Sequence, residues 1–225
     1  MSKILTLGCG TKPRKSDADW TECINLDLLP LEGVQVVHDL NVHPWPFEPE
    51  SFDSVEADNV IEHVNDLIAF VEECHRLLKL RRPHGAPGTL VLPGPLAGTM
   101  NHLIDPTHQR GLTEFTFDFF DPETPFGREG WFYSPARFRV WKMQVVAGGA
   151  KPGEVAFRDV PVGELLPYEL CSGPLLHRVP GLDLRFQLIK LPADSRVVEL
   201  RRVAGHAQRT HAYAHQLNPT EDPIL

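Results

Sequence analysis

The stretch that decides the fold is Ile4-Leu5-Thr6-Leu7-Gly8-Cys9-Gly10, a short apolar run stopped by two glycines. A short apolar run bounded by turn residues predicts a buried parallel strand. The glycines let the backbone turn tightly and approach a ligand closely, since no side chain intervenes. The stretch lacks the GxGxxG spacing of a dinucleotide site, so on its own it fits a plain strand-to-helix turn equally well.

The rest of the chain alternates apolar runs with polar crossovers. Besides 4–7, apolar runs predict strands at 23–27, 34–39, 52–57, 89–92, 139–146 and 184–191. Apolar residues at helical spacing predict a helix from about Glu62 to Leu80. This alternation predicts a parallel sheet with right-handed crossovers, in which ligands bind at the carboxyl ends of the strands.

Two of the predicted strands end in an acidic residue. Asp27 could accept two hydrogen bonds from a ribose diol, and Asp39 could accept one from an adenine amino group. Taken singly, each acid is better explained as a helix cap or a solvated loop residue. Only their order along the chain, after the glycine turn, favours a nucleotide-like ligand.

Composition restricts the class of protein. The 225 residues are 42% hydrophobic and carry a net charge of -8, which argues against a protein that grips a nucleic-acid backbone. The apolar runs fall far short of the roughly 20 residues needed to span a bilayer. The four cysteines lack CxxC spacing and the sequence shows no signal peptide, so we expect reduced thiols in a cytoplasmic protein without membrane attachment. Composition does not indicate an oligomeric state.

In combination, these motifs resemble the class I S-adenosylmethionine-dependent methyltransferases, and most of all their type 11-like branch. The resemblance covers about residues 4–93 and rests on Leu5-Thr6-Leu7-Gly8-Cys9-Gly10, Asn25-Leu26-Asp27, His38-Asp39-Leu40, Pro44-Trp45-Pro46-Phe47, Ser51-Phe52-Asp53, Asn59-Val60-Ile61-Glu62-His63-Val64 and His75-Arg76-Leu77-Leu78-Lys79. It implies a Rossmann-like, doubly wound, mostly parallel sheet of seven strands, with helices on both faces and an antiparallel last strand. We expect one such domain over residues 1–195 and a partly mobile C-terminal extension over 196–225.

The resemblance also implies the cofactor, S-adenosylmethionine, and the residues that bind it. The cofactor-binding residues carried over are Leu7, Gly8, Cys9, Gly10, Asp27, Leu28, Asp39, Leu40, Asn59 and Glu62. Three departures concern the details near the methionine carboxylate and the fifth strand. Thr6 stands where many relatives have an acid, Lys12 replaces a third glycine, and an insertion at 81–87 precedes Gly88.

The segment 94–135, which follows the fifth strand, is expected to be a loop-rich cap over the acceptor. Its candidate acceptor-binding residues are His102, Asp105, His108 and Arg110, and His63 and His108 are the candidate catalytic residues. The simpler interpretation of His63 is that it packs on the cofactor in the first turn of the predicted helix. His102, Asp105 and His108 could also ligate a metal, but Asp-Pro-Thr is a turn former, so no metal is predicted. The many aromatic residues of 115–133 are more simply explained as the small core of the cap.

The expected reaction is an in-line displacement in which an acceptor atom attacks the methyl carbon and S-adenosylhomocysteine leaves. Acidic net charge and a histidine-rich cap favour a small molecule, sugar or glycan precursor as the acceptor. A non-catalytic or regulatory protein that keeps the cofactor fold is the alternative. A nicotinamide-dependent oxidoreductase is disfavoured by the missing GxGxxG.

Overall fold

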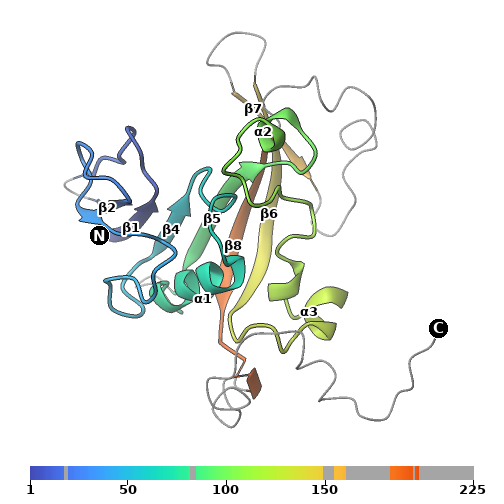
Figure 1. The fold of residues 1–225 in the computed structure, drawn as a ribbon. Helices are drawn as coiled ribbons and strands as arrows, with labels where there is room; N and C mark the ends of the chain where they lie inside the picture. Colours follow the sequence, from blue (N-terminus) through green and yellow to red (C-terminus); the bar gives the residue numbers. More distant parts are fainter. Residues whose placement is uncertain (18–19, 82–84, 149–154, 161–182, 195, 198–225) are drawn as a thin grey trace.

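A computed structural model describes residues 1–17, 20–81, 85–148, 155–160, 183–194, 196 and 197. Its centre is one sheet of eight strands in the order β3-β2-β1-β4-β5-β8-β6-β7 (Figure 1). The strands are β1 (Ser2–Leu7), β2 (Thr21–Asp27), β3 (Val36–Val37), β4 (Ser54–Ala57), β5 (Thr89–Pro95), β6 (Arg137–Gly148), β7 (Val155–Val160) and β8 (Asp183–Leu191). All seven strands predicted from the sequence are present, within a few residues of their expected bounds.

The direction of the strands confirms the expected topology. β1 pairs in parallel with β2 and β4, β2 with β3, and β4 with β5, whereas β8 runs antiparallel between β5 and β6. The eighth strand, β7, lies in a stretch for which we expected only loops, and it pairs antiparallel with β6 at the far edge of the sheet. The sheet therefore has one strand more than the seven expected.

The helical layers are thinner than a doubly wound sheet implies. α1 (Leu67–Leu77) is the one helix longer than five residues in the described part of the chain, and it lies against the sheet in Figure 1. It begins later than the predicted Glu62 because the Asp66 side chain caps it by accepting from the Ala69 N–H, and its C-cap Leu78 is already extended. None of the described helices is long and apolar enough to cross a membrane.

The segment 94–135 divides into two parts. Residues 96–112 form a loop that carries α2 (Met100–Leu103) and is closed by a bridge between Leu96 and Leu112, just beyond the carboxyl end of β5. Residues 113–135 carry the 3-10 helix η1 (Asp118–Phe120) and α3 (Pro125–Glu129). Fully buried Phe117 packs edge-on against Phe186 of β8, with ring centres 4.8 Å apart. Phe117 and Phe120 thus join the core, whereas Phe119, Phe126 and Tyr133 stay exposed. The loop 96–112, beyond the carboxyl end of β5, is the part placed to cover a ligand.

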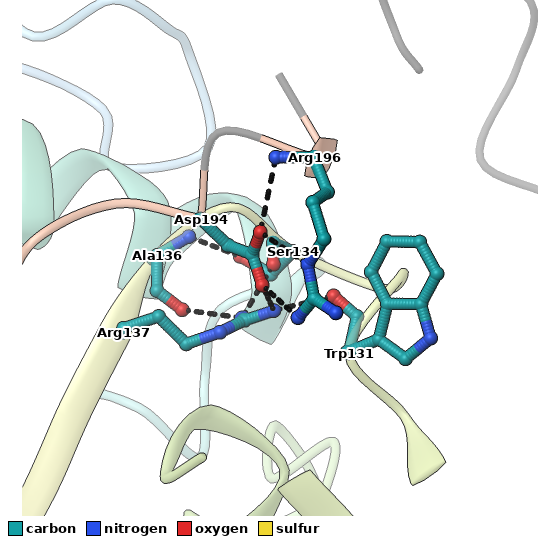
Figure 2. Close-up of polar contacts among 6 residues, drawn as sticks. All are labelled: Trp131, Ser134, Ala136, Arg137, Asp194 and Arg196. Carbon is teal, nitrogen blue, oxygen red and sulfur yellow. Dashed lines mark hydrogen bonds and ion pairs between the residues drawn. The ribbon is translucent and has the colours of Figure 1, made fainter. Parts of the chain in front are cut away.

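Residues that follow β8 form an ion-pair cluster with the first residue of β6 (Figure 2). The Asp194 carboxylate lies 3.1 Å from the Arg137 guanidinium and 2.7 Å from that of Arg196. Buried Arg137 also donates to the backbone carbonyls of Ser134 and Trp131, and Arg196 lies over the Trp131 ring. The cluster therefore holds the segment just after β8 against the first residue of β6. Beyond residue 197, the predicted C-terminal extension lies outside the described residues.

Candidate functional site

The glycine turn stands at the carboxyl end of β1, where the neighbouring strand on one side is β2 and on the other β4. Gly8 and Gly10 both have the left-handed backbone that favours glycine, with φ of 58° and 53°. A Cβ on Gly8 would lie 2.5 Å from the Val60 side chain, whereas a Cβ on Gly10 would meet no atom within 4 Å. Gly8 is therefore needed for packing, and Gly10 leaves open space above the loop that a ligand can fill.

Asp27, at the carboxyl end of β2, anchors this turn. Its Oδ2 accepts a hydrogen bond of 2.8 Å from the Gly10 N–H, and its Oδ1 accepts one of 3.0 Å from the Leu29 N–H. Each carboxylate oxygen retains a further lone pair, so the side chain can still accept from a ligand hydroxyl. Leu7 and Cys9 are buried beside it, while Leu28 is 61% exposed along the same edge.

Asp39 and Leu40 follow β3 at the same edge of the sheet. The His38 N–H donates to the Asp27 carbonyl, which keeps the two chain segments side by side. Asp39 Oδ1 accepts from both the backbone and the side-chain N–H groups of Asn41. This acid therefore stabilises a loop, which is the role that the sequence offered as the alternative to adenine binding. Half-buried Leu40 uses its carbonyl to accept from the Trp45 indole.

The open surface above Gly10 and the carboxylate of Asp27 suit an adenosyl group with a ribose diol. The carboxyl ends of β1, β2 and β4 meet here, which is where open α/β sheets bind ligands. Exposed Asn59 follows β4, has a φ of 51°, and donates its backbone N–H to the Pro93 carbonyl. The predicted cofactor residues therefore occupy one edge, with Val60 packed on Gly8 from the β4 side.

Residues 61–65 form a turn and not the first turn of a helix, so the expected helical position of His63 is wrong. The Arg110 guanidinium donates to the carbonyls of Ile61, Val64 and Asn65, and the Gln109 N–H donates to the Glu62 carbonyl. These bonds replace the backbone bonds that a helix would make. Arg110 thus holds the turn in shape, and its charged group points at backbone oxygen, away from an acceptor.

Glu62 is the most perturbed acid of this region. Its side chain is 1% exposed, and its Oε2 has no hydrogen-bond partner among the described residues. Burial, which disfavours the charged form, raises the pKa of Glu62 to about 7. A carboxyl group with this pKa can gain or lose a proton near neutral pH.

His63 and His108 lie edge to face, with ring centres 4.7 Å apart. Nδ1 of His108 lies 3.0 Å from the carbonyl oxygen of His102, and Nδ1 of His63 lies 2.9 Å from the Thr107 hydroxyl. Thr107 in turn donates its proton to Asp105. Glu62, His63 and His108 each place one potential ligand atom within 4.8 Å of the other two. Among the described residues it is this group that could hold a metal, and not the His102–Asp105–His108 set considered from the sequence.

A cavity of about 510 Å³ opens beside these side chains. It is lined by Asn59, Glu62, His63, Pro95, Asn101, Ile104, Asp105, Pro106, His108 and Asp183. Of the four predicted acceptor-binding residues, Asp105 and His108 line it, whereas His102 and Arg110 do not. His102 Nδ1 accepts from the Gly98 N–H instead. The aromatic residues of 115–133 are absent from the lining.

Sequence reasoning missed Asn101 and Asp183. The Asn101 amide donates to the Asp183 carboxylate over 3.0 Å, and burial raises the pKa of Asp183. Asp183 is the first residue of β8, and the antiparallel register places it opposite Pro95 at the carboxyl end of β5. No local sequence signal shows this, because it depends on pairing between segments 88 residues apart.

Comparisons with known proteins agree with this geometry. Residues 18–81 match a family model described as a methyltransferase domain, and no curated protein matches the chain. An S-adenosylmethionine-dependent methyltransferase from Thermotoga maritima, described as a possible histamine N-methyltransferase, has a TM-score of 0.51 at 14% identity, covering 85% of this chain and 83% of that one. A chain in the complex of the Haloferax volcanii Trm112 methyltransferase activator with a putative methyltransferase has a TM-score of 0.50 at 14% identity, with the same coverage.

At 14% identity the solved structures show a shared fold alone. The family model adds a similarity in sequence over residues 18–81. The matched stretch carries Asp27, Asp39, Asn59 and Glu62, and the glycine turn lies just ahead of it. Residues 18–81 are therefore similar in sequence to the methyltransferase domain family, and this matched stretch forms most of the predicted cofactor edge within a sheet of the same fold.

Proposed function

We propose that this protein transfers the methyl group of S-adenosylmethionine to a hydroxyl of a small polar molecule, such as a sugar or glycan precursor, bound in the 510 Å³ cavity. The proposal rests on one observation: the segment 59–63 contacts both the cofactor edge and the cavity. Val60 packs on Gly8 of the cofactor edge, while its neighbours Asn59, Glu62 and His63 line the cavity. An acceptor in the cavity therefore lies next to the cofactor edge.

On the cofactor side, the chain supplies an open backbone surface and one carboxylate. The backbone of Gly10 would face the ligand, and Asp27 would accept from the ribose hydroxyls while it holds the turn. The cofactor supplies a methyl group on a positively charged sulfur. Alignment of the acceptor with that methyl can provide much of the catalysis.

The cavity lining indicates the chemistry of the acceptor. It is rich in hydrogen-bond acceptors, with carboxylates from Glu62, Asp105 and Asp183 and imidazoles from His63 and His108. Such a lining suits a ligand with several O–H or N–H donors and repels an anion. The volume is that of a typical small-molecule site. These features support a neutral polyol or an amine in preference to a phosphorylated or carboxylated substrate.

In the proposed reaction, the acceptor oxygen forms a bond to the methyl carbon as the sulfur–carbon bond breaks and its electron pair stays on sulfur. The hydroxyl proton must leave, and Nε2 of His63 or His108 can accept it because Nδ1 of each ring already has a partner. Arg110 acts indirectly, by holding the turn that carries Glu62 and His63.

The test is methyl transfer from labelled S-adenosylmethionine to a panel of neutral sugars, polyols, amines and their phosphorylated counterparts. We expect transfer to a neutral donor-rich compound. His108→Ala should lower kcat/KM for that acceptor about 10-fold or more, with cofactor affinity changed by only a few-fold. Tight cofactor binding with no transfer to any member of the panel would favour the non-catalytic alternative. Transfer to the phosphorylated members alone would refute the assigned acceptor chemistry.

A further inference from the structure

Three side chains with metal-ligating atoms converge in the acceptor cavity. One such atom each from buried Glu62, exposed His63 and half-buried His108 lie within 4.8 Å of one another. We propose that these residues bind a divalent first-row transition ion such as Zn²⁺, and that this ion holds the acceptor's hydroxyl oxygen. The binding of the ion is independent of the proposed function; only its role toward the acceptor depends on it.

The hydrogen bonds around both histidines prepare the same ring nitrogen for a metal. The His102 carbonyl can only accept, so His108 carries its proton on Nδ1 and has its lone pair on Nε2. Thr107 gives its one proton to Asp105 over 2.6 Å, so its oxygen accepts from Nδ1–H of His63. A metal-binding histidine is typically oriented in this way, by donating its other N–H to a carbonyl or to a carboxylate-linked group.

Glu62 supplies an independent observation at the same place. The residue is 1% exposed, yet its buried Oε2 has no partner among the described residues. A buried carboxyl oxygen without a partner is costly, and native proteins pair such atoms with a hydrogen-bond donor or an ion. A cation between Glu62 and the two imidazoles would satisfy it.

The donor set and its surroundings select the kind of ion. Two imidazoles and one carboxylate bind zinc or iron in enzymes and leave a coordination position for water or substrate. Bonds of about 2.0–2.1 Å place tetrahedral ligand atoms roughly 3.4 Å apart, so small side-chain rotations must close the present spacing. Asp105 Oδ2, 3.8 Å from His108 Nε2, and Asp183 across the cavity add negative charge that favours a cation.

A bound ion would replace the free imidazoles in activating the acceptor. The hydroxyl oxygen would occupy the open position, and its proton would be released more readily because the ion stabilises the alkoxide. The proton would pass to solvent, the oxygen–methyl bond would form, and the electron pair of the broken bond would remain on sulfur. This mechanism narrows the acceptor to a compound with an accessible hydroxyl.

The experiment measures metal binding alone, without cofactor or acceptor. The full chain is stripped with a chelator and titrated with Zn²⁺ by calorimetry and with Co²⁺ by visible absorption. We expect one ion per chain and a Co²⁺ spectrum without the thiolate charge-transfer band that cysteine ligands would give. Glu62→Gln, which keeps the shape of the side chain, and His108→Ala should each weaken binding by at least about 100-fold, above the loss typical of outer-shell changes. Thr107→Val should weaken it about 10-fold through His63.

His102→Ala is the matched control. It removes a neighbouring imidazole that stacks 6.5 Å from His108, but keeps the backbone carbonyl to which His108 donates. It should bind Zn²⁺ as tightly as the wild type, and circular dichroism should confirm that every variant is folded. Absence of stoichiometric binding in the wild type would overturn the proposal. Full affinity in folded Glu62→Gln, or its loss in His102→Ala, would do so as well. Since cofactor binding is measured separately, none of these results decides the proposed function.

Discussion

Gly10→Ala separates the two things that a glycine can do at the end of β1. The residue has a φ of 53°, and a Cβ added there would meet no atom within 4 Å. The cost to the fold is therefore conformational only, about 1–2 kcal/mol for an alanine in the left-handed region, partly offset by the stiffer unfolded chain. We expect a net loss of about 1 kcal/mol in the free energy of unfolding.

The same Cβ would stand in the space assigned to the cofactor. Affinity for S-adenosylhomocysteine should therefore fall at least about 10-fold, which corresponds to about 1.4 kcal/mol. Urea unfolding measures the first effect and calorimetric titration measures the second. The two losses are independent because the first comes from the backbone of the free protein and the second from contact with the ligand.

Gly85→Ala provides a matched control. Gly85 has a φ of 83° and equally open surroundings, but it lies before β5, at the opposite edge of the sheet. It should lose a similar amount of stability and bind S-adenosylhomocysteine normally. Gly8→Ala should be worse than either for stability, since its Cβ would overlap Val60 and overpacking adds about 1–3 kcal/mol. Normal ligand affinity in Gly10→Ala would refute the assignment of the space above the turn.

Asp27, Arg110 and His75 can each be tested by substitution. Asp27→Ala should weaken cofactor binding by about 1.5–3 kcal/mol in calorimetry, because the carboxylate serves both the ligand and the Gly10 N–H. Asp27→Asn should weaken it by less. Wild-type affinity in Asp27→Ala would contradict this prediction. Arg110→Ala should lower the free energy of unfolding by about 1.5–3 kcal/mol, since it leaves the carbonyls of the 61–65 turn without their charged donor, while Arg110→Lys should recover only part of the loss; unchanged stability would count against a positioning role. Burial lowers the pKa of His75 to about 4 from 6.5, and its Nε2–H donates to the Leu191 carbonyl. Because the unfolded chain binds this proton first, stability should fall as the pH drops from about 6.5 to 4, by up to about 1.4 kcal/mol per pH unit. A His75→Gln variant should show a shallower slope, and an equal slope would exclude His75 as the cause.

The strand ends that form the proposed cofactor edge could be predicted from the sequence because they follow directly from local rules. An apolar strand ending in Gly8 and Gly10, and a next strand ending in Asp27, fix their own positions once the sheet is parallel. The same local rules predicted seven of the eight strands. They missed β7, whose short run gains its stability from pairing with β6, beyond what its own sequence indicates.

The cavity proposed as the acceptor site could be predicted only in part, since its lining residues are brought together by contacts between distant segments. Asp183 reaches the cavity through antiparallel pairing of β8 with β5. Arg110 has the residue type of a ligand-binding group, but the turn at 61–65 lacks helical hydrogen bonds and takes up its guanidinium. Glu62 and His108, 46 residues apart, meet because 96–112 folds back over that turn.

Calorimetric titration of the full chain with S-adenosylhomocysteine, in buffer that contains a metal chelator, tests the central claim most directly. We expect binding of one ligand per chain, with no requirement for a metal, and a similar result with S-adenosylmethionine. NAD titrated under the same conditions should give no binding heat. Absence of binding by both adenosyl ligands, or binding of NAD in their place, would contradict the assignment of the glycine turn and Asp27 to this cofactor.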